Sequence, residues 1–161
     1  MASNIYLKIE GIQGDSTDAQ HKDEIRVNSF QWAEAEITSG GGGAGGAVGK
    51  TEFGNLTVHI STSSASPKLF LACASGEHFL KAVLTAEKAG GAHPAPYLTI
   101  TLQDVLIASF AIDCEHAPDV PNETVGMSFS KIQWEYRKQN PDGSSGTPVA
   151  TGWDIRQQKA F

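Results

Sequence analysis

Apolar and polar residues alternate along most of the chain with a period of two, which is the pattern of half-buried β-strands. Ile5 to Ile9 follows this pattern, and Leu56, Val58 and Ile60 repeat it within a predicted strand over Thr51 to Ser61. Further alternation over Tyr97 to Leu102 continues into Val105 to Ile112. The chain is therefore expected to consist mainly of β-strands.

In two strand regions the apolar residues change from one parity to the other. One change lies between Val27 and Phe30, inside a predicted strand over Glu24 to Trp32. The other lies between Phe129 and Ile132, inside one long predicted strand region. Such a change indicates either a β-bulge or a strand with large apolar groups on both faces.

One segment has the signals of a short helix, over about residues 67–75. Ser66 is predicted to cap it and Pro67 to be its first residue, where the missing N–H group is harmless. Gly76 can adopt the left-handed conformation that ends a helix. The cap predicts that Ser66→Ala costs about 1 kcal/mol.

Such a short helix needs support, so Leu69, Phe70 and Cys73 are expected to pack on the sheet. The following segment, His78 to Thr85, is compatible with more helix, but a strand leading into Gly90 and Gly91 is favoured. Short strands separated by turn residues, with one helix, predict a mainly β fold, an antiparallel barrel or sandwich. Residues 1–161 are expected to form one domain.

The stretch AGGAVGKT, Ala44 to Thr51, matches the loose form of a phosphate-binding loop. That geometry requires a buried strand before the loop and a helix after it. The residues before the loop contain no apolar run, and the residues after Thr51 alternate as a strand. The sequence therefore favours a flexible Gly-rich loop over residues 40–49 between two strands.

Charge and composition exclude several classes of partner. The 12 basic and 18 acidic residues give a net charge of −6, which disfavours nucleic acid as a partner. Apolar runs stay well below the ~18 residues of a membrane span, so membrane insertion is not expected. The N-terminus has no features of a secretory signal, which places folding in the cytosol and any export on another route.

The sequence contains no recognisable catalytic or metal-binding motif. Cys73 and Cys114 belong to no zinc spacing and are expected to be ordinary thiols rather than a disulfide. The five histidines are scattered, and Cys114 to His116 has no second cluster of ligands. Asp23 and Glu24 are adjacent carboxylates that would face opposite ways in a strand. We expect no enzyme activity, no metal and no cofactor.

Several segments occur in an order that resembles the haemolysin-coregulated protein (Hcp) family of bacterial type VI secretion systems. They are YLKIEGIQGDS, HKDEIRVNSFQW, SPKLFLACASGEHFLKAVLTAEKAGG, YLTITLQDVLIASF, MSFSKIQWEYRKQNPDGSSG and the terminal TGWDI. The resemblance spans Ile5 to about Lys159, and its first and helical segments are the most specific.

This resemblance implies a β-barrel with one flanking helix, assembled as a six-membered ring. Rings of the family stack into a tube that a contracting sheath expels, with effector proteins in the lumen. The implied partners are further copies of the chain, the type VI tip protein, the sheath and effectors. The protein would reside in the bacterial cytoplasm before firing and then be secreted without a cleavable signal peptide. Because the chain stops at Phe161, no fused effector domain is expected.

The resemblance also gives the Gly-rich loop a role, because the corresponding loop of the family lies at a face of the ring and contacts the next ring. Ordering such a loop costs about 1–2 kcal/mol per residue, which stacking contacts must offset. Val48 and Lys50 would be its side-chain anchors. The predicted ring-stacking residues are Gly40, Gly41, Gly42, Gly43, Gly46, Val48, Gly49 and Lys50.

A tube needs two distinct interfaces on each subunit. The two parity changes are candidate locations for them, and purely internal burial explains these changes equally well. The alternative to a tube subunit is a monomeric β-sandwich binding module, for example one that recognises sugars, with an aromatic-lined pocket. A nucleotide hydrolase using Ala44 to Thr51 ranks third.

Overall fold

The computed structural model describes residues 3–37, 49–90, 94–115 and 120–161. These residues form strands and one α-helix, α1 (Ser66–Ser75). The strands are β1 (Ser3–Ile9), β2 (Ile25–Gln31), β3 (Glu34–Ile37), β4 (Lys50–Phe53), β5 (Leu56–Ser61), β6 (His78–Lys88), β7 (Pro96–Asp113), β8 (Asn122–Ser128), β9 (Lys131–Gln139), β10 (Ser145–Asp154) and β11 (Lys159–Ala160).

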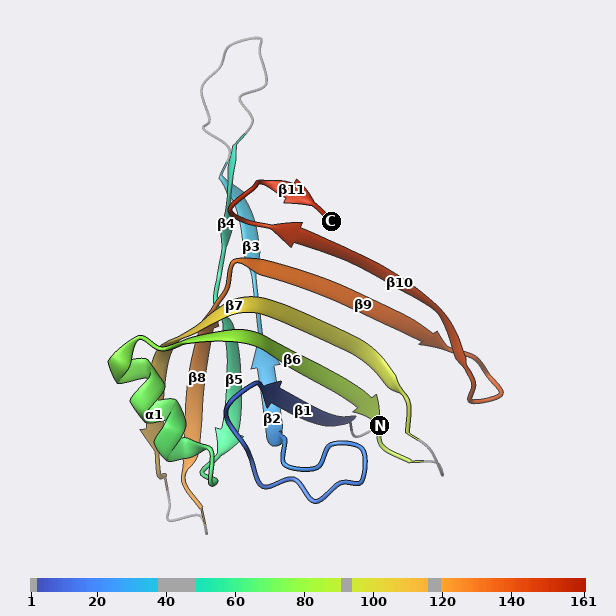
Figure 1. Ribbon diagram of the computed structural model, residues 1–161. Helices are drawn as coiled ribbons and strands as arrows, with labels where there is room; N and C mark the ends of the chain where they lie inside the picture. Colours follow the sequence, from blue (N-terminus) through green and yellow to red (C-terminus); the bar gives the residue numbers. More distant parts are fainter. Residues whose placement is uncertain (1–2, 38–48, 91–93, 116–119) are drawn as a thin grey trace.

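Six antiparallel strands close into a barrel, in the order β1, β2, β5, β8, β7 and β6. The β7–β8 pairing completes the circle, which excludes the sandwich that the sequence also allowed. Inward side chains fill the barrel: Leu56, Val58 and Ile60 of β5 are buried and alternate with half-exposed residues, as their spacing predicts. Figure 1 shows α1 against one side of this barrel.

The β7 strand is a single strand of 18 residues that contains both predicted segments, Tyr97 to Leu102 and Val105 to Ile112. It passes Asp104, whose φ of 53° is left-handed, and changes its partner at this point. Its first half pairs with β9 and its second half with β8. The predicted long strand around Phe129 is correspondingly two strands, β8 and β9, and the parity change falls at the break between them.

The other parity change is a β-bulge, because the pairing of β2 with β5 shifts register between Val27 and Ser29. The predicted strand over Thr51 to Ser61 is interrupted, since β4 ends at Phe53 and β5 begins at Leu56. The backbone N–H of Gly54 donates to the carbonyl of Ala33 (2.9 Å) and so fixes this interruption.

The helix was predicted nearly in place, but its cap was wrong. The cap position is Ala65, which makes no side-chain capping hydrogen bond, and the helix begins at Ser66. The Ser66 hydroxyl accepts a hydrogen bond from the backbone N–H of Ser63 (2.9 Å) and donates to the buried carboxylate of Glu123 (2.8 Å). Gly76 has a φ of 69° and ends the helix as predicted. The segment after it is the favoured strand, β6.

Packing of the helix on the barrel was also predicted only in part. Leu69 is buried and Cys73 is half-buried against the core, as expected. Phe70 is 60% exposed, and its ring meets that of Phe110 edge-on. The expectation for Phe70 was therefore wrong, because a helix of ten residues turns only part of its surface toward the barrel.

Candidate assembly surfaces

Most of the predicted stacking residues lie outside the described residues, namely Gly40, Gly41, Gly42, Gly43, Gly46 and Val48. Gly49 precedes β4, and Lys50 is the exposed first residue of that strand, opposite Ile37 of β3. A Cβ atom at Gly49 would collide with the carbonyl oxygen of Ile37. The close approach of the two strands therefore requires glycine at this position.

Strands β3 and β4 form a two-stranded arm. They pair only with each other, over Glu34 to Ile37 and Lys50 to Phe53. Every residue of β3 is exposed, and Figure 1 shows the arm projecting from the barrel. Ile37, the last residue of β3, is 51% exposed, so the arm presents an apolar side chain to solvent. The arm is thus exposed enough for another chain to bind it.

The geometry of the arm contradicts nucleotide binding. Lys50 and Thr51 would have to open a helix whose backbone N–H groups face the phosphates. Both residues instead lie in β4 and pair with β3. The rejection of the phosphate-binding loop from the sequence is confirmed.

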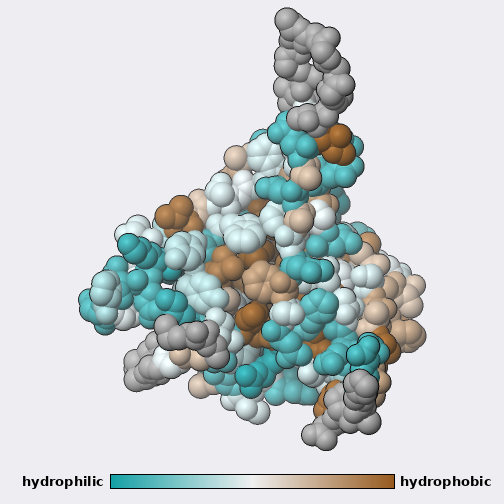
Figure 2. Space-filling view, turned by 180° about the vertical axis from the view of Figure 1, so that it is seen from behind, coloured by the Kyte–Doolittle hydropathy of each residue, from teal (hydrophilic) through white to brown (hydrophobic). Residues whose placement is uncertain are grey.

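A groove of about 810 Å³ lies between the base of the arm and strands β9 and β10. Trp32 anchors the groove, because its Nε1 donates to the carbonyl of Gly54 (2.9 Å) and its ring lies 5.9 Å from that of Trp134. The groove is lined by Trp32, Phe53, Ile132, Trp134 and Trp153 together with the acidic Glu34 and Glu36. Figure 2 shows apolar side chains gathered in a hollow below the arm. The sequence did not predict this groove, since its walls come from three distant segments.

A second candidate surface is the free edge of β10. Within the described part of the chain, β11 pairs only with Trp153 and Asp154, so most of β10 has a strand partner on one side alone. Val149 of this strand is 72% exposed, and Leu80 of β6 is 82% exposed. Unpaired edges and exposed apolar side chains are surfaces that another chain can cover.

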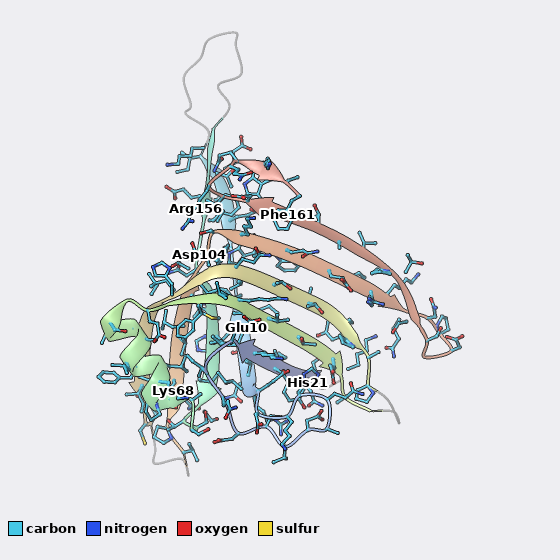
Figure 3. The ribbon with its side chains drawn as sticks, in the orientation of Figure 1. Glu10, His21, Lys68, Asp104, Arg156 and Phe161 are labelled. Atoms are coloured by element: carbon cyan, nitrogen blue, oxygen red, sulfur yellow. The ribbon has the colours of Figure 1, made fainter. Side chains whose placement is uncertain are left out.

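One polar cluster superficially resembles a catalytic triad. His78 Nδ1 lies 3.0 Å from a carboxylate oxygen of Asp104, and Ser130 Oγ lies 2.6 Å from the other oxygen of the same carboxylate. The serine hydroxyl therefore donates to the aspartate and not to the histidine, which leaves it without a base. The hydrogen bonds from Ser130 and His78 lower the pKa of Asp104, and Figure 3 shows Arg156 beside it. The cluster is a set of ion pairs at a strand bend.

Metal and disulfide chemistry gain no support from the described residues. They contain no group of three or more His, Cys, Asp or Glu side chains arranged to hold a metal ion. Cys73 and Cys114 are free thiols, as predicted. Among the same residues, no helix has the length and apolar character needed to cross a membrane.

Sequence reasoning missed a buried cluster around His21. It treated the five histidines as scattered and Glu24 only as a neighbour of Asp23, yet in the fold His21 contacts both Glu24 and Glu87 of β6. The fold reveals the cluster through β6, where Leu84, Thr85, Ala86 and Glu87 are four consecutive buried residues. Two buried faces on one strand require a second covering element, which here is the segment between β1 and β2.

Comparison with known proteins gives one consistent result. The family model described as "Type VI secretion system effector, Hcp" matches residues 6–136. Protein hcp1 of Pseudomonas aeruginosa is 37% identical over 158 residues, which cover 98% of each chain.

Solved structures agree with this result. The crystal structure of Hcp1 from Salmonella typhimurium is 34% identical, covers 100% of both chains and has a TM-score of 0.81. A structure described as a type six secretion system protein is 26% identical, with a TM-score of 0.93 over 99% of this chain and 100% of its own. The barrel, the arm and the helix are thus matched over the full length, and the chain belongs to the Hcp family of type VI secretion proteins.

Proposed function

We propose that this chain is the subunit of a type VI inner tube, in which six copies form a ring and rings stack head to tail. The tube is expelled by sheath contraction and carries effectors in its lumen. The protein acts without catalysis, resides in the bacterial cytoplasm before firing, and is then exported without a cleavable signal peptide. Its partners are its own copies, the tip protein, the sheath and effectors.

The observation that supports this proposal most directly is the presence of two different outward surfaces on one barrel. The arm of β3 and β4 projects from the barrel, whereas the open β10 edge with Val149 lies along the extended sheet. A closed ring and a stack of rings need two different interfaces on each subunit. A barrel with only one such surface could form rings or stacks, but not both.

The first test is the mass of the purified protein by light scattering, followed by class-averaged electron micrographs. We expect a particle of six times the subunit mass of 17.1 kDa, with six-fold symmetry. A stable monomer over the accessible concentrations would contradict the proposal. It would favour the binding-module alternative, for which the aromatic groove at Trp32 and Trp153 is the specific supporting observation.

The second test concerns the arm tip, where we propose that residues 40–49 form the stacking contact. Shortening Gly40 to Gly46 should preserve six-membered rings and reduce their stacking, because the arm then reaches less far. The matched control replaces Gly41 and Gly43 by Ser, which keeps the length of the loop. Electron micrographs count rings per stack. Dissociation of the rings themselves would show that this loop is not the stacking element.

A further inference from the structure

The segment between β1 and β2, residues 10–24, covers the second face of β1 and β6. It is internally tied by backbone hydrogen bonds, from Gly14 N to Asp23 O (2.8 Å) and from Ser16 N to Glu24 O (3.0 Å). Figure 1 draws this segment at the end of the barrel away from the arm, and Figure 3 shows His21 on it. The segment contacts β6 at both ends, through the backbone N–H of Glu10, which donates to the carbonyl of Lys81 (3.1 Å), and through His21, which contacts Glu87.

His21 joins two carboxylates that come from different parts of the chain. Its Nδ1 lies 2.8 Å from Glu24 Oε2, and its Nε2 lies 2.6 Å from Glu87 Oε1. Glu87 is 1% exposed and His21 is 8% exposed. The ring of Tyr6 stacks on the imidazole at 4.2 Å between centroids and 6° between planes. Each ring nitrogen therefore faces a carboxylate oxygen, and stacking on Tyr6 fixes the orientation of the imidazole ring.

The two contacts determine the protonation state that His21 needs. A carboxylate only accepts hydrogen bonds, and a neutral imidazole has one donor and one acceptor. Two carboxylates can therefore both be bonded to His21 only when it is an imidazolium. Loss of that proton would leave a nitrogen lone pair facing a buried carboxylate, which costs far more than the loss of an exposed contact.

The other charged and titratable groups around His21 do not supply this proton. Asp18 accepts hydrogen bonds from the backbone N–H groups of Gln20 (2.9 Å) and His21 (3.2 Å). Tyr6 of β1 lies opposite Arg26 of β2, and burial together with Asp18 raises the pKa of its hydroxyl. Burial lowers the pKa of His21, but hydrogen bonds and charges from Glu87 and Glu24 outweigh it, so the net shift is upward.

We propose that His21, Glu24 and Glu87 form a proton-dependent clasp that fixes the segment between β1 and β2 on β6 and releases it when His21 loses its proton. Under the proposed tube function, this segment lies at the barrel end opposite the stacking arm, so release would change the surface that a neighbouring ring meets. That consequence rests on the proposed function. The clasp itself is a property of the single chain.

The direction of the pH effect follows from the raised pKa of His21. The stabilisation is fully present below the pKa of an unfolded histidine, about 6.5. It is lost as the pH rises through the higher pKa of His21 in the folded protein. The clasp is therefore closed below a pH of about 6.5 as long as its two carboxylates are ionised, and it opens as the pH rises through the pKa of folded His21.

The clasp can be tested by NMR titration of the full chain labelled with ¹³C-histidine, with His21→Gln used to assign the His21 signal. We expect His21 to titrate above about 6.5. Hydrogen exchange of the Gly14, Ser16 and Asp23 amides should then accelerate with the same midpoint. The excess over the intrinsic pH dependence should be about tenfold or more, equivalent to ~1.4 kcal/mol.

The decisive variant is Glu87→Gln, because the new amide can donate to a neutral His21 at Nε2 while Nδ1–H donates to Glu24. We expect the His21 pKa to fall and the alkaline acceleration of exchange to disappear. The matched control is Glu123→Gln, which changes another carboxylate that is 1% exposed but makes no contact with His21. This control should leave the His21 titration unchanged.

Three results would overturn the clasp: a His21 titration at or below about 6.5, loop protection that is independent of that titration, or a Glu87→Gln protein with an unchanged His21 pKa. The first two are measured on the unmodified chain, so a variant that fails to fold does not remove the test. Neither readout needs rings. A protein that makes no rings but titrates as expected would contradict the tube proposal alone.

Discussion

At the scale of single residues, buried carboxylates depend on particular donors. Glu123 is 1% exposed and accepts hydrogen bonds from Ser66 Oγ (2.8 Å) and Thr62 Oγ (3.2 Å). The sequence suggested that Ser66 caps the helix, but in the fold its hydroxyl is committed to this carboxylate. Burying a charged group is tolerable only when such hydrogen bonds are made.

Ser66→Ala should therefore destabilise the protein by more than the loss of a cap. We expect about 1.5–3 kcal/mol, the value of a hydrogen bond to a charged group, because Glu123 loses one of its donors. Urea unfolding measures the change. Ser75→Ala, at the exposed end of the same helix, is the control and should have little effect. A loss below ~1 kcal/mol in Ser66→Ala would mean that water or Thr62 replaces the donor.

The residues of the candidate sites could be anticipated only in part. His21 and Glu24 are visible in the sequence as polar residues, but nothing in their spacing connects them to Glu87, 66 positions from His21. Nothing in the sequence connected Trp32, Trp134 and Trp153 with one another either. Side chains that meet across strands are placed by register, which a single sequence does not specify at this separation.

At the scale of elements, local signals were reliable where backbone conformation is decided locally. Gly76 ends α1 with a φ of 69°, as its position predicted. Alternation located β1 and β5, because their apolar residues Leu7, Ile9, Leu56, Val58 and Ile60 face the barrel core. The breaks after Phe53 and Phe129 were missed, since each depends on a distant partner, Ala33 in one case and Gln103 in the other.

Gly76→Ala should destabilise the helix end by about 1 kcal/mol, because an L-residue is strained at positive φ. The space around this position is open, so a steric clash contributes nothing. Thermal unfolding measures the effect. Gly76→Asn should lose less, since Asn tolerates the left-handed conformation. Equal losses in the two variants would show that backbone conformation is not the cause.

At the scale of the whole molecule, the barrel closes around one core and leaves an open strand edge. Val149→Asp adds a charge to that edge, on a side chain that is 72% exposed. We expect the stability of the subunit to change by less than ~0.5 kcal/mol, as for most surface substitutions. Light scattering should show particles smaller than the parent assembly, because the charge would be buried in the interface.

Gln139→Asp is the control for this prediction, since it adds the same charge at an exposed position of the same hairpin and removes no apolar surface. If Val149→Asp leaves the assembly unchanged, the ring interface does not lie at the β10 edge. Leu80, which is 82% exposed on β6, would then be the next position to test.

The sequence by itself determined the secondary structure class, the position of the helix, and that Thr51 lies in a strand and not in the helix that a phosphate-binding loop requires. Each of these follows from alternation, turn residues or backbone conformation, which act over a few neighbouring residues. Membership of the Hcp family was also visible, because it is carried by ordered segments along the chain.

Only the tertiary structure decided that the sheet closes through β7 and β8, that the arm base forms an aromatic groove, and that His21 is bonded to two carboxylates. These features join residues that are far apart in the chain. Their energies depend on distance, burial and strand register, which are properties of the folded arrangement and have no counterpart in local sequence patterns.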